Sequence, residues 1–298
     1  GVASAIYPNS LSPSRVLAEH YKKGGVDEHL QPIVFLGRDS KPLTINNHDG
    51  VILFNFRADR MRMLTSRLLH RARGANMRIA AMTAYDLAFA MEVAFSRHKR
   101  IPSLSDVLAD SECEQVHIAE TEKYAHVTYF LNGGREGAAK KERYVLVQSR
   151  KDVRTHDCAP EMRAGEITDA LIRELNNGTS FIVVNYANAD MVGHTANMPA
   201  TIRAVETIDM CLQRFISAAE KRNIPVLISA DHGNAELNRD MESGIPHTAH
   251  TANLVPCIVT KHGISLRHGE GLSSVAPTIL QLLGIPKPSS MNASSLID

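Results

Sequence analysis

Short apolar runs alternate along this chain with longer amphipathic stretches, and this alternation constrains the possible fold more than any other feature. The pattern is clearest after residue 100. Strands are expected at Val116–Ala119, Tyr144–Gln148, Phe181–Tyr186, Pro225–Ser229 and Val255–Thr260, and helices at Thr121–Leu131, Ala164–Leu175, Pro199–Arg222 and Val275–Leu283. Buried strands that alternate with helices of this kind favour a parallel sheet covered on both faces. We therefore predict an α/β protein with a three-layer, mostly parallel sheet.

The first third of the chain shows the same alternation in a shorter form. Strands are expected at Pro32–Gly37, Val51–Phe56 and Arg78–Tyr85, and a helix at Arg57–Arg73. A basic, proline-containing segment, Arg97–Pro102, follows, and a helix is expected to begin near Ser103. This change of composition predicts a domain boundary, with one domain at 1–98 and the other at 99–298. In the second domain, Asn197 is placed to cap the longest helix, whose first turn tolerates Pro199.

Composition excludes several classes of protein. The 298 residues have a formal net charge of only +1, so no bulk field would attract nucleic acid or a membrane surface. The four cysteines are far apart and form no C-x-x-C pair, which argues against a zinc ribbon or a disulfide scaffold. No apolar stretch is long enough to cross a bilayer, and the N-terminus lacks the pattern of a signal peptide. We expect a soluble protein of the reducing cytoplasm.

Two short segments each follow an apolar run and supply a carboxylate together with an imidazole. Asp190 and His194 follow one predicted strand, and Asp231 and His232 follow another. In open α/β sheets, ligands collect beyond the carboxyl ends of the strands, so both segments should lie at that edge. Aspartate oxygens combined with histidine nitrogens favour zinc or manganese, and two such clusters indicate a two-metal site.

The spacing within each segment predicts different roles. If a helical turn follows Asp190, its side chain shares a face with His194, four residues on, and the two can hold one ion. Asp231 and His232 are sequential, so their side chains diverge and suit a bridge toward a second ion. A lone Asp or His after a strand is usually a helix cap or a hydrogen-bonded loop residue. The prediction therefore depends on the joint pattern.

A further imidazole lies downstream in the segment that contains His247 and His250. Either histidine could complete the set of ligands. Their spacing alone does not distinguish them.

Five segments resemble the cofactor-independent phosphoglycerate mutases, members of the alkaline-phosphatase-like superfamily, and the resemblance extends over nearly the whole chain. They are residues 54–60 (FNFRADR), 119–128 (AETEKYAHVT), 185–195 (NYANADMVGHT), 230–235 (ADHGNA) and 247–251 (HTAHT). The first two distinguish this family from other members of the superfamily. The resemblance implies a sheet of the alkaline-phosphatase-like type together with part of a second α/β domain, the transferase domain.

The resemblance also implies an activity. It is the reversible interconversion of 3-phosphoglycerate and 2-phosphoglycerate in glycolysis and gluconeogenesis, without bisphosphoglycerate. In this family a serine accepts the phosphoryl group, the glycerate reorients while bound, and the group returns to the other hydroxyl. Two divalent cations take part, usually Mn²⁺, with Mg²⁺, Co²⁺ or Zn²⁺ as alternatives, and the family suggests a monomer.

By the same resemblance, Asp190, His194 and His250 match the ligands of one cation, whereas Asp231 and His232 match part of the shell of the other. All five residues are thus expected at a single edge of the sheet. The assignment of His250 comes from the family and not from spacing.

Three basic residues match positions that bind the substrate. Arg57 and Arg60 match arginines of the transferase domain, and Lys123 matches a catalytic lysine beside the phosphoryl group. Arginine presents a planar fork that suits carboxylate and phosphate oxygens, and lysine supplies a point charge where phosphoryl oxygens accumulate negative charge. Without the resemblance, the arginines would be assigned to a solvated helix face and Lys123 to the exposed side of a short helix.

The chain begins with Gly1, and no serine in it lies in the Ser-Glu-Val-Gly-His type of motif that carries the family's nucleophile. The resemblance implies that an N-terminal segment supplies the first strands of the phosphatase domain, its first metal-binding Asp and that Ser. We expect residues 1–98 to be the C-terminal part of the transferase domain and 99–298 that of the phosphatase domain. The chain alone should therefore be inactive, with the missing segment as its partner.

Two other interpretations remain open. The chain could belong to another metal-dependent phosphatase, phosphomutase or phosphodiesterase of the superfamily. It could also be a non-catalytic, metal-binding remnant that has lost the half with the nucleophile.

Overall fold

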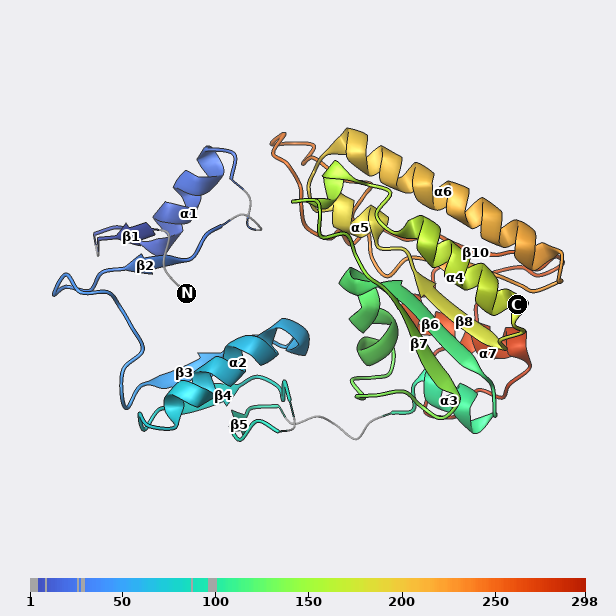
Figure 1. The fold of residues 1–298 in the computed structure, drawn as a ribbon, viewed down its shortest axis with the longest axis horizontal. Helices are drawn as coiled ribbons and strands as arrows, with labels where there is room; N and C mark the ends of the chain where they lie inside the picture. The colour runs from blue at the N-terminus through green and yellow to red at the C-terminus, as the bar shows by residue number, and fades with distance from the viewer. Residues whose placement is uncertain (1–4, 9, 26, 28–29, 87, 96–100) are drawn as a thin grey trace. The chain divides into compact units, whose positions relative to one another are not determined.

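The computed structural model describes residues 5–8, 10–25, 27, 30–86, 88–95 and 101–298, except the side chains of residues 59 and 60 (Figure 1). The chain divides into two compact units, Gly1–Lys99 and Arg100–Asp298. The expected domain boundary, between 98 and 99, lies within residues 96–100, which are outside the described residues. The assignment of the units as transferase and phosphatase domains stays a prediction.

The first unit contains two small parallel sheets. Its elements are β1 (Ala5–Tyr7), α1 (Pro13–Lys22), β2 (Ile33–Phe35), β3 (Gly50–Leu53), α2 (Ala58–Ala72), β4 (Arg78–Ala81) and β5 (Glu92–Val93). Strand β1 pairs with β2, and β3, β4 and β5 form the second sheet in that order. The fully buried Tyr85 fixes the end of this sheet, because its hydroxyl donates to the carbonyl oxygens of Leu53 and Asn55.

The second unit is built on a parallel sheet with the strand order β7–β6–β8. Its elements are α3 (Leu104–Asp110), β6 (Gln115–Glu120), η2 (Thr121–Lys123), η3 (His126–Phe130), β7 (Glu142–Val147), η4 (His156–Cys158), α4 (Ala164–Asn176), β8 (Phe181–Asn185), α5 (Asn188–Gly193), α6 (Met198–Glu220), β9 (Leu227–Ser229), β10 (Cys257–Val259), η5 (Leu272–Ser274) and α7 (Val275–Leu283). Strands β9 and β10 form a separate antiparallel pair. The structure is thus α/β with parallel sheets, as predicted, except at this pair.

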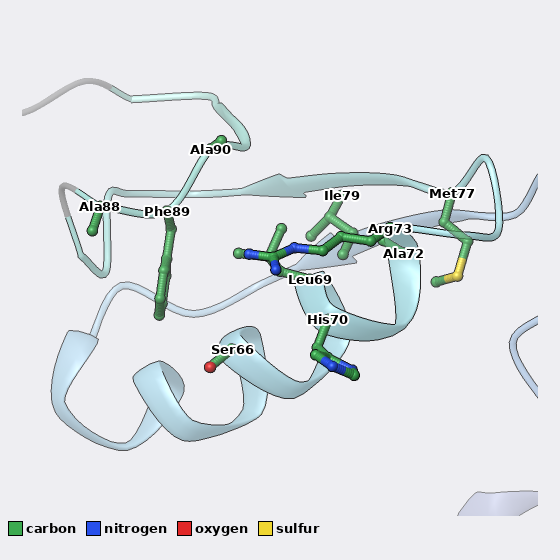
Figure 2. A pocket seen from close by; sticks show the side chains of 10 residues that line it. All are labelled: Ser66, Leu69, His70, Ala72, Arg73, Met77, Ile79, Ala88, Phe89 and Ala90. Atoms are coloured by element: carbon green, nitrogen blue, oxygen red, sulfur yellow. The ribbon is translucent and has the colours of Figure 1, made fainter.

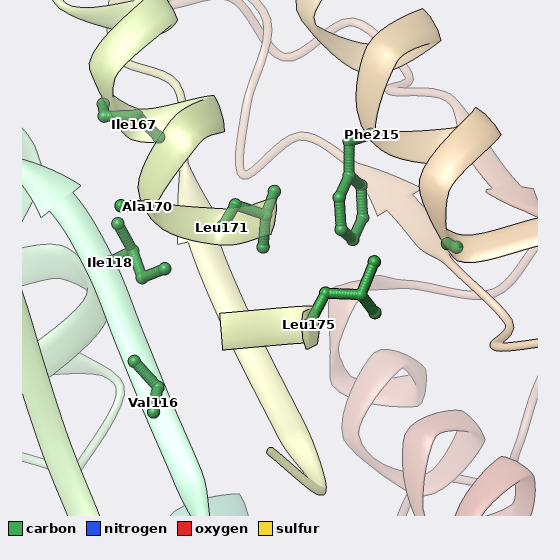
Figure 3. Close-up of a cluster of buried hydrophobic side chains, with 8 residues drawn as sticks. Val116, Ile118, Ile167, Ala170, Leu171, Leu175 and Phe215 are labelled. Atoms are coloured by element: carbon green, nitrogen blue, oxygen red, sulfur yellow. The ribbon is translucent and has the colours of Figure 1, made fainter. Parts of the chain in front are cut away.

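Every residue of the central strand β6 is buried, and successive side chains point to opposite faces of the sheet. Val116 and Ile118 belong to one buried cluster with Leu171 of α4 and Phe215 of α6 (Figure 3). Burying such side chains stabilises the fold by roughly 1.5–3 kcal/mol each. On the other face, β6 contacts α3 and η3. Helices therefore lie on both sides of this sheet and hold the carboxyl ends of its strands in place.

The helix expected over Thr121–Leu131 does not form as one continuous α-helix. It is replaced by a 3₁₀ turn at Thr121–Lys123 and a π-helix at His126–Phe130. In the π-helix, the Leu131 N–H donates to the His126 carbonyl at 3.2 Å. An α-helix would direct that N–H to Val127, whose carbonyl instead accepts from a buried histidine of β6, His117, at 2.6 Å. A side chain from the sheet thus competes for the helical hydrogen bond.

The predicted cap of the longest helix is confirmed. The Asn197 side chain accepts a hydrogen bond from the Ala200 N–H, with Pro199 in the first turn of α6. Ser103 similarly caps α3, where it forms a reciprocal capping box with Asp106. Among the described residues, no helix combines the length and the apolarity that a bilayer crossing requires.

Candidate metal centre

Asp190 and His194 lie on the short helix α5, which begins three residues after β8 ends. Asp190 is in its first turn and His194 caps its C-terminus, so the two side chains share a face, as predicted. The Asp190 Oδ1 and His194 Nε2 atoms are 3.2 Å apart. Helix α5 also packs closely on the loop after β9, since a Cβ atom at Gly193 would lie 2.3 Å from Asn234 Oδ1.

His250 completes a compact group of three potential ligands. Its Nε2 atom lies 3.2 Å from both Asp190 Oδ1 and His194 Nε2. Within the described residues, Asp190, His194 and His250 form the one group of this kind, with ligand atoms within 4.8 Å of one another. His247, the alternative in the sequence, is not a member of it.

The donor atoms of this group fit a divalent cation. His194 Nδ1 lies 2.6 Å from the Thr248 carbonyl oxygen, which requires a proton on Nδ1, so Nε2 is the ring atom that faces Asp190 and His250. A carboxylate oxygen and two imidazole nitrogens thus converge, an arrangement that needs a cation or additional protons between them. One oxygen and two nitrogens are a workable ligand set for zinc or manganese.

Lys123 is buried beside this group and not exposed, in contrast to the expectation from its sequence context alone. Its side chain is 7% exposed, and Nζ donates to Asp190 Oδ2. Asn234 Nδ2 donates to the other oxygen, Asp190 Oδ1, at 2.6 Å. The Asp190 carboxylate is therefore held on both oxygens. Asn234 lies in one of the five segments, but its side-chain type gave no separate signal for this role.

The protonation of the three ligands reflects their contacts. Burial opposes ionisation of Asp190, but the hydrogen bonds from His194 and Lys123 outweigh it and hold the pKa of Asp190 far below its usual value. The hydrogen bond to Asp190 raises the pKa of His194. Burial lowers the pKa of His250, an effect that the Asp190 charge partly offsets. The carboxylate is thus available as a ligand at any physiological pH.

Asp231 and His232 follow β9 and form a more open arrangement. The Asp231 side chain is 53% exposed, and its Oδ2 atom is 3.4 Å from His232 Nε2. The His232 ring stacks on that of His250 with centroids 3.6 Å apart, so this pair adjoins the first group. Both residues also line a cavity of about 640 Å³ next to β9 and β10. Within this unit, the structure brings together Lys123 and all five residues predicted as metal ligands.

The predicted substrate arginines lie in the first unit. Arg57 caps the N-terminus of α2, where its N–H donates to Asn55 Oδ1 at 2.7 Å, and its side chain is exposed. Arg60 lies in α2, but its side chain is outside the described residues. The same unit has a cavity of about 420 Å³ between α2 and the segment after β4, lined by Leu69, Ile79 and Phe89 among others (Figure 2). Among the side chains that the structure describes, none predicted for the site lines this cavity.

Comparisons with known proteins agree on one family. Residues 29–287 match the metalloenzyme superfamily. The chain is 44% identical to the 2,3-bisphosphoglycerate-independent phosphoglycerate mutase of Moorella thermoacetica, over 96% of this chain and 57% of that protein. It is 42% identical to mutase 2 of Methanosarcina barkeri, over 100% of this chain and 60% of that protein. The chain therefore spans somewhat more than half the length of these relatives.

A solved structure supports the same relationship. The phosphoglycerate mutase of Leishmania mexicana, crystallised at low cobalt concentration, superposes with a TM-score of 0.81 at 28% sequence identity. The superposition covers 100% of this chain and 59% of that one.

Proposed function

The chain belongs to the metalloenzyme superfamily, and from this premise we propose that it forms part of a 2,3-bisphosphoglycerate-independent phosphoglycerate mutase. A longer protein that includes it would interconvert 3-phosphoglycerate and 2-phosphoglycerate through a phosphoserine, in the cytoplasm and as a monomer. The similarity to the Moorella and Methanosarcina mutases supports this proposal. The observation that carries it is the convergence of Asp190, His194 and His250 beside the buried Lys123.

Two divalent cations are part of the proposal. Asp190, His194 and His250 would hold one of them, and Asp231 and His232 would supply part of the shell of the other. Mn²⁺ is the preferred ion, with Mg²⁺, Co²⁺ and Zn²⁺ as alternatives. When bound, such cations polarise a phosphoryl group and lower the pKa of a hydroxyl nucleophile.

The side chains of this chain would bind and orient the substrate. Lys123 Nζ, already directed at Asp190, would place a positive charge where phosphoryl oxygens gain negative charge. Arg57 and Arg60 would bind the carboxylate or phosphate through their planar forks. The role of these arginines is proposed from the resemblance of residues 54–60 to the family.

The nucleophile is proposed to lie outside this sequence. No serine here has the context of the family's nucleophile, and the chain spans 57% of the Moorella relative. Loss of a covalent nucleophile removes the reaction path and does not merely slow it. The 298-residue chain alone should therefore be inactive, and the missing part should also complete the three-layer sheet.

An enolase-coupled assay tests this function. The chain would be assayed with Mn²⁺ alone and as a fusion to the part of the Moorella mutase that lies outside the match. We expect no turnover of 3-phosphoglycerate by the chain alone and metal-dependent turnover by the fusion. Replacing Lys123 by Met in the fusion should abolish the activity. Full activity of the chain alone would refute the proposed division of the active site.

The same fusion distinguishes the second candidate, another phosphatase or phosphomutase of the superfamily. Pentose phosphates and a generic phosphomonoester would be compared with the phosphoglycerates under identical conditions. Turnover of those compounds without turnover of phosphoglycerate would favour the alternative. A fusion that binds Mn²⁺ but transforms none of them would favour a non-catalytic remnant.

A further inference from the structure

A second polar cluster lies beneath the central strand, on the opposite face from α4. Its centre is His117 of β6, whose side chain is completely buried. Its neighbours are Gln115 on the same strand, Glu142 and Tyr144 on β7, and the carbonyl of Val127 in η3. None of these residues belongs to the candidate metal centre. Burying a histidine and a carboxylate away from solvent costs free energy unless both are paired and hydrogen-bonded.

Hydrogen-bond accounting fixes the protonation of the His117 ring. Its Nδ1 atom lies 2.6 Å from Val127 O and 3.2 Å from Glu142 Oε1, two acceptors. Its Nε2 atom lies 3.2 Å from Gln115 Oε1. The oxygen and nitrogen of the Gln115 side-chain amide cannot exchange places, because Gln115 Nε2 donates to the Ser105 carbonyl at 2.8 Å. Both ring nitrogens therefore face acceptors, and this geometry favours a hydrogen on each of them.

The carboxylate of Glu142 balances this charge. Its Oε1 atom accepts from Asn132 Nδ2 at 2.7 Å, and Oε2 accepts from Arg135 Nη2 at 2.9 Å and from the Ala139 N–H. Burial is the largest influence on the pKa of His117 and, together with Arg135, holds it below its usual value, although the Val127 carbonyl and Glu142 raise it. A neutral ring would nevertheless leave one lone pair against a carbonyl oxygen, a cost that the charged ring avoids.

This cluster determines the conformation of the segment that carries Lys123. The π-helical bond from Leu131 N–H to His126 O leaves the Val127 carbonyl available to His117. Downstream of the π-helix, Asn132 and Arg135 bind Glu142. Upstream of it, the Tyr124 ring packs edge-on against Tyr144, with centroids 6.0 Å apart. Tyr124 directly follows Lys123, so the cluster fixes the chain on both sides of η3 and immediately after the lysine.

We propose that His117 is a positioning residue for Lys123. As a doubly protonated ring paired with Glu142, it holds the π-helical register of residues 126–130, and this register places Lys123 Nζ on Asp190. The importance of this placement for catalysis depends on the proposed mutase function, whereas the placement itself does not. The inference can therefore be tested without measuring enzyme activity.

The first test is a direct measurement on the 298-residue chain. Selective ¹⁵N labelling of histidine and NMR at pH 7 should show one-bond N–H couplings at both ring nitrogens of His117. A His117→Phe variant identifies the resonances. A ring with only one bound proton would overturn the proposal.

The second test measures the position of Lys123. Brief acylation with acetic anhydride should modify Lys123 on the order of tenfold faster in His117→Phe and in Glu142→Gln than in the chain without substitutions. Peptide mass spectrometry would measure the extent of acylation. Lys140, whose side chain is 69% exposed, is the internal standard. Thr278→Val is the matched control, because Thr278 is buried and hydrogen-bonded to Ser274 and Leu296, outside this cluster.

The control separates positioning from general destabilisation. Thr278→Val should lower the unfolding temperature and leave the acylation rate of Lys123 unchanged. If His117→Phe does not fold, the milder Glu142→Gln variant still decides the question. Equal acylation of Lys123 in all folded variants would overturn the proposal, whether or not the complete enzyme proves to be a mutase.

Discussion

Asp190 with His194 and Asp231 with His232 arise from the same sequence pattern, a strand followed by a carboxylate and an imidazole, but the structure treats them differently. The first pair lies on one face of α5 with His250 as a third member, and its carboxylate side chain is 14% exposed. The second pair lies in a loop beside a large cavity, and its carboxylate is 53% exposed.

The difference shows what converts a motif into a binding group. A four-residue spacing on a helix brings two side chains together without further help. Asp231 and His232 do not diverge as expected, since their side chains approach to 3.4 Å, but among the residues that the structure describes this pair has no third ligand of its own and depends on other segments to complete a site. Asp190 also has fixed partners on both oxygens, Lys123 and Asn234, so its geometry is largely set before any cation binds. We therefore expect the first group to bind a cation independently and the second to contribute little by itself.

The largest effect is expected from Asp190→Asn. This change removes the anionic member of the first group, so the affinity for Mn²⁺ should fall by on the order of 100-fold or more. Isothermal titration calorimetry would measure the loss, with circular dichroism to verify folding. Asp169→Asn is the control, because Asp169 is exposed and pairs with Arg214 on the helix surface. If both variants bind equally well, the first group is not the metal site.

Gly193→Ala tests the close contact between α5 and the loop after β9. A Cβ atom there would lie 2.9 Å from Asn234 Cγ and 3.5 Å from Ala235 Cα, so the loop must shift. We expect a loss of about 1–3 kcal/mol in the free energy of unfolding, together with weaker Mn²⁺ binding. Chemical denaturation measures the first effect. Gly165→Ala in α4, where nothing lies within 4 Å, should be neutral or stabilising.

Lys123→Met tests whether the Lys123 ammonium group competes with the cation for Asp190. Removing the ammonium group frees Asp190 Oδ2, so the affinity for Mn²⁺ should rise, by up to about tenfold. A loss of Mn²⁺ binding in this variant would instead make Lys123 a structural support of the group. Calorimetry at constant pH would measure the change, and Lys140→Met, at an exposed position, provides the control.

The smallest effect concerns pH in the metal-free chain. The hydrogen bond to Asp190 raises the pKa of His194, so NMR should find its titration midpoint above the ordinary value of 6.5. The stabilisation of the folded chain by this hydrogen bond is fully present below the pKa that His194 has in the unfolded chain. It is lost as the pH rises through the pKa that His194 has in the folded chain. It should amount to less than about 1 kcal/mol at this partly exposed site. In Asp190→Asn the midpoint should move down, and an unchanged midpoint would contradict the pairing.

Local sequence patterns were sufficient for the elements that depend on local chemistry. The helix at Val275–Leu283 has the predicted bounds, and the Asn197 cap and the four-residue spacing of Asp190 and His194 predicted the observed geometry. These features depend on side chains close in sequence. The residues predicted as ligands lie near one another because Asp190 follows β8, Asp231 follows β9, and His250 precedes β10, the strand that pairs with β9. Their role as ligands stays a prediction.

Features that depend on distant partners could not be predicted in this way. The π-helix at His126–Phe130 forms because His117, from another element, takes a carbonyl that an α-helix would use. Lys123 is buried because Asp190, 67 residues away, provides its counter-charge. The antiparallel pairing of β9 with β10 is likewise a tertiary property, which apolar runs alone do not encode. Helix α1 was not predicted, although the Ser12 cap and Pro13 in its first turn are local signals for it. Strands β1 and β5 have only three and two residues, too few to show a pattern.

The most direct test of the account is a Mn²⁺ titration of the 298-residue chain, followed by electron paramagnetic resonance, with Asp231→Asn and His250→Ala in parallel. We predict one tight site per chain, unchanged within about threefold by Asp231→Asn and lost in His250→Ala. No tight site, or a site that requires Asp231 but not His250, would contradict the claim that Asp190, His194 and His250 form a metal-binding group of their own.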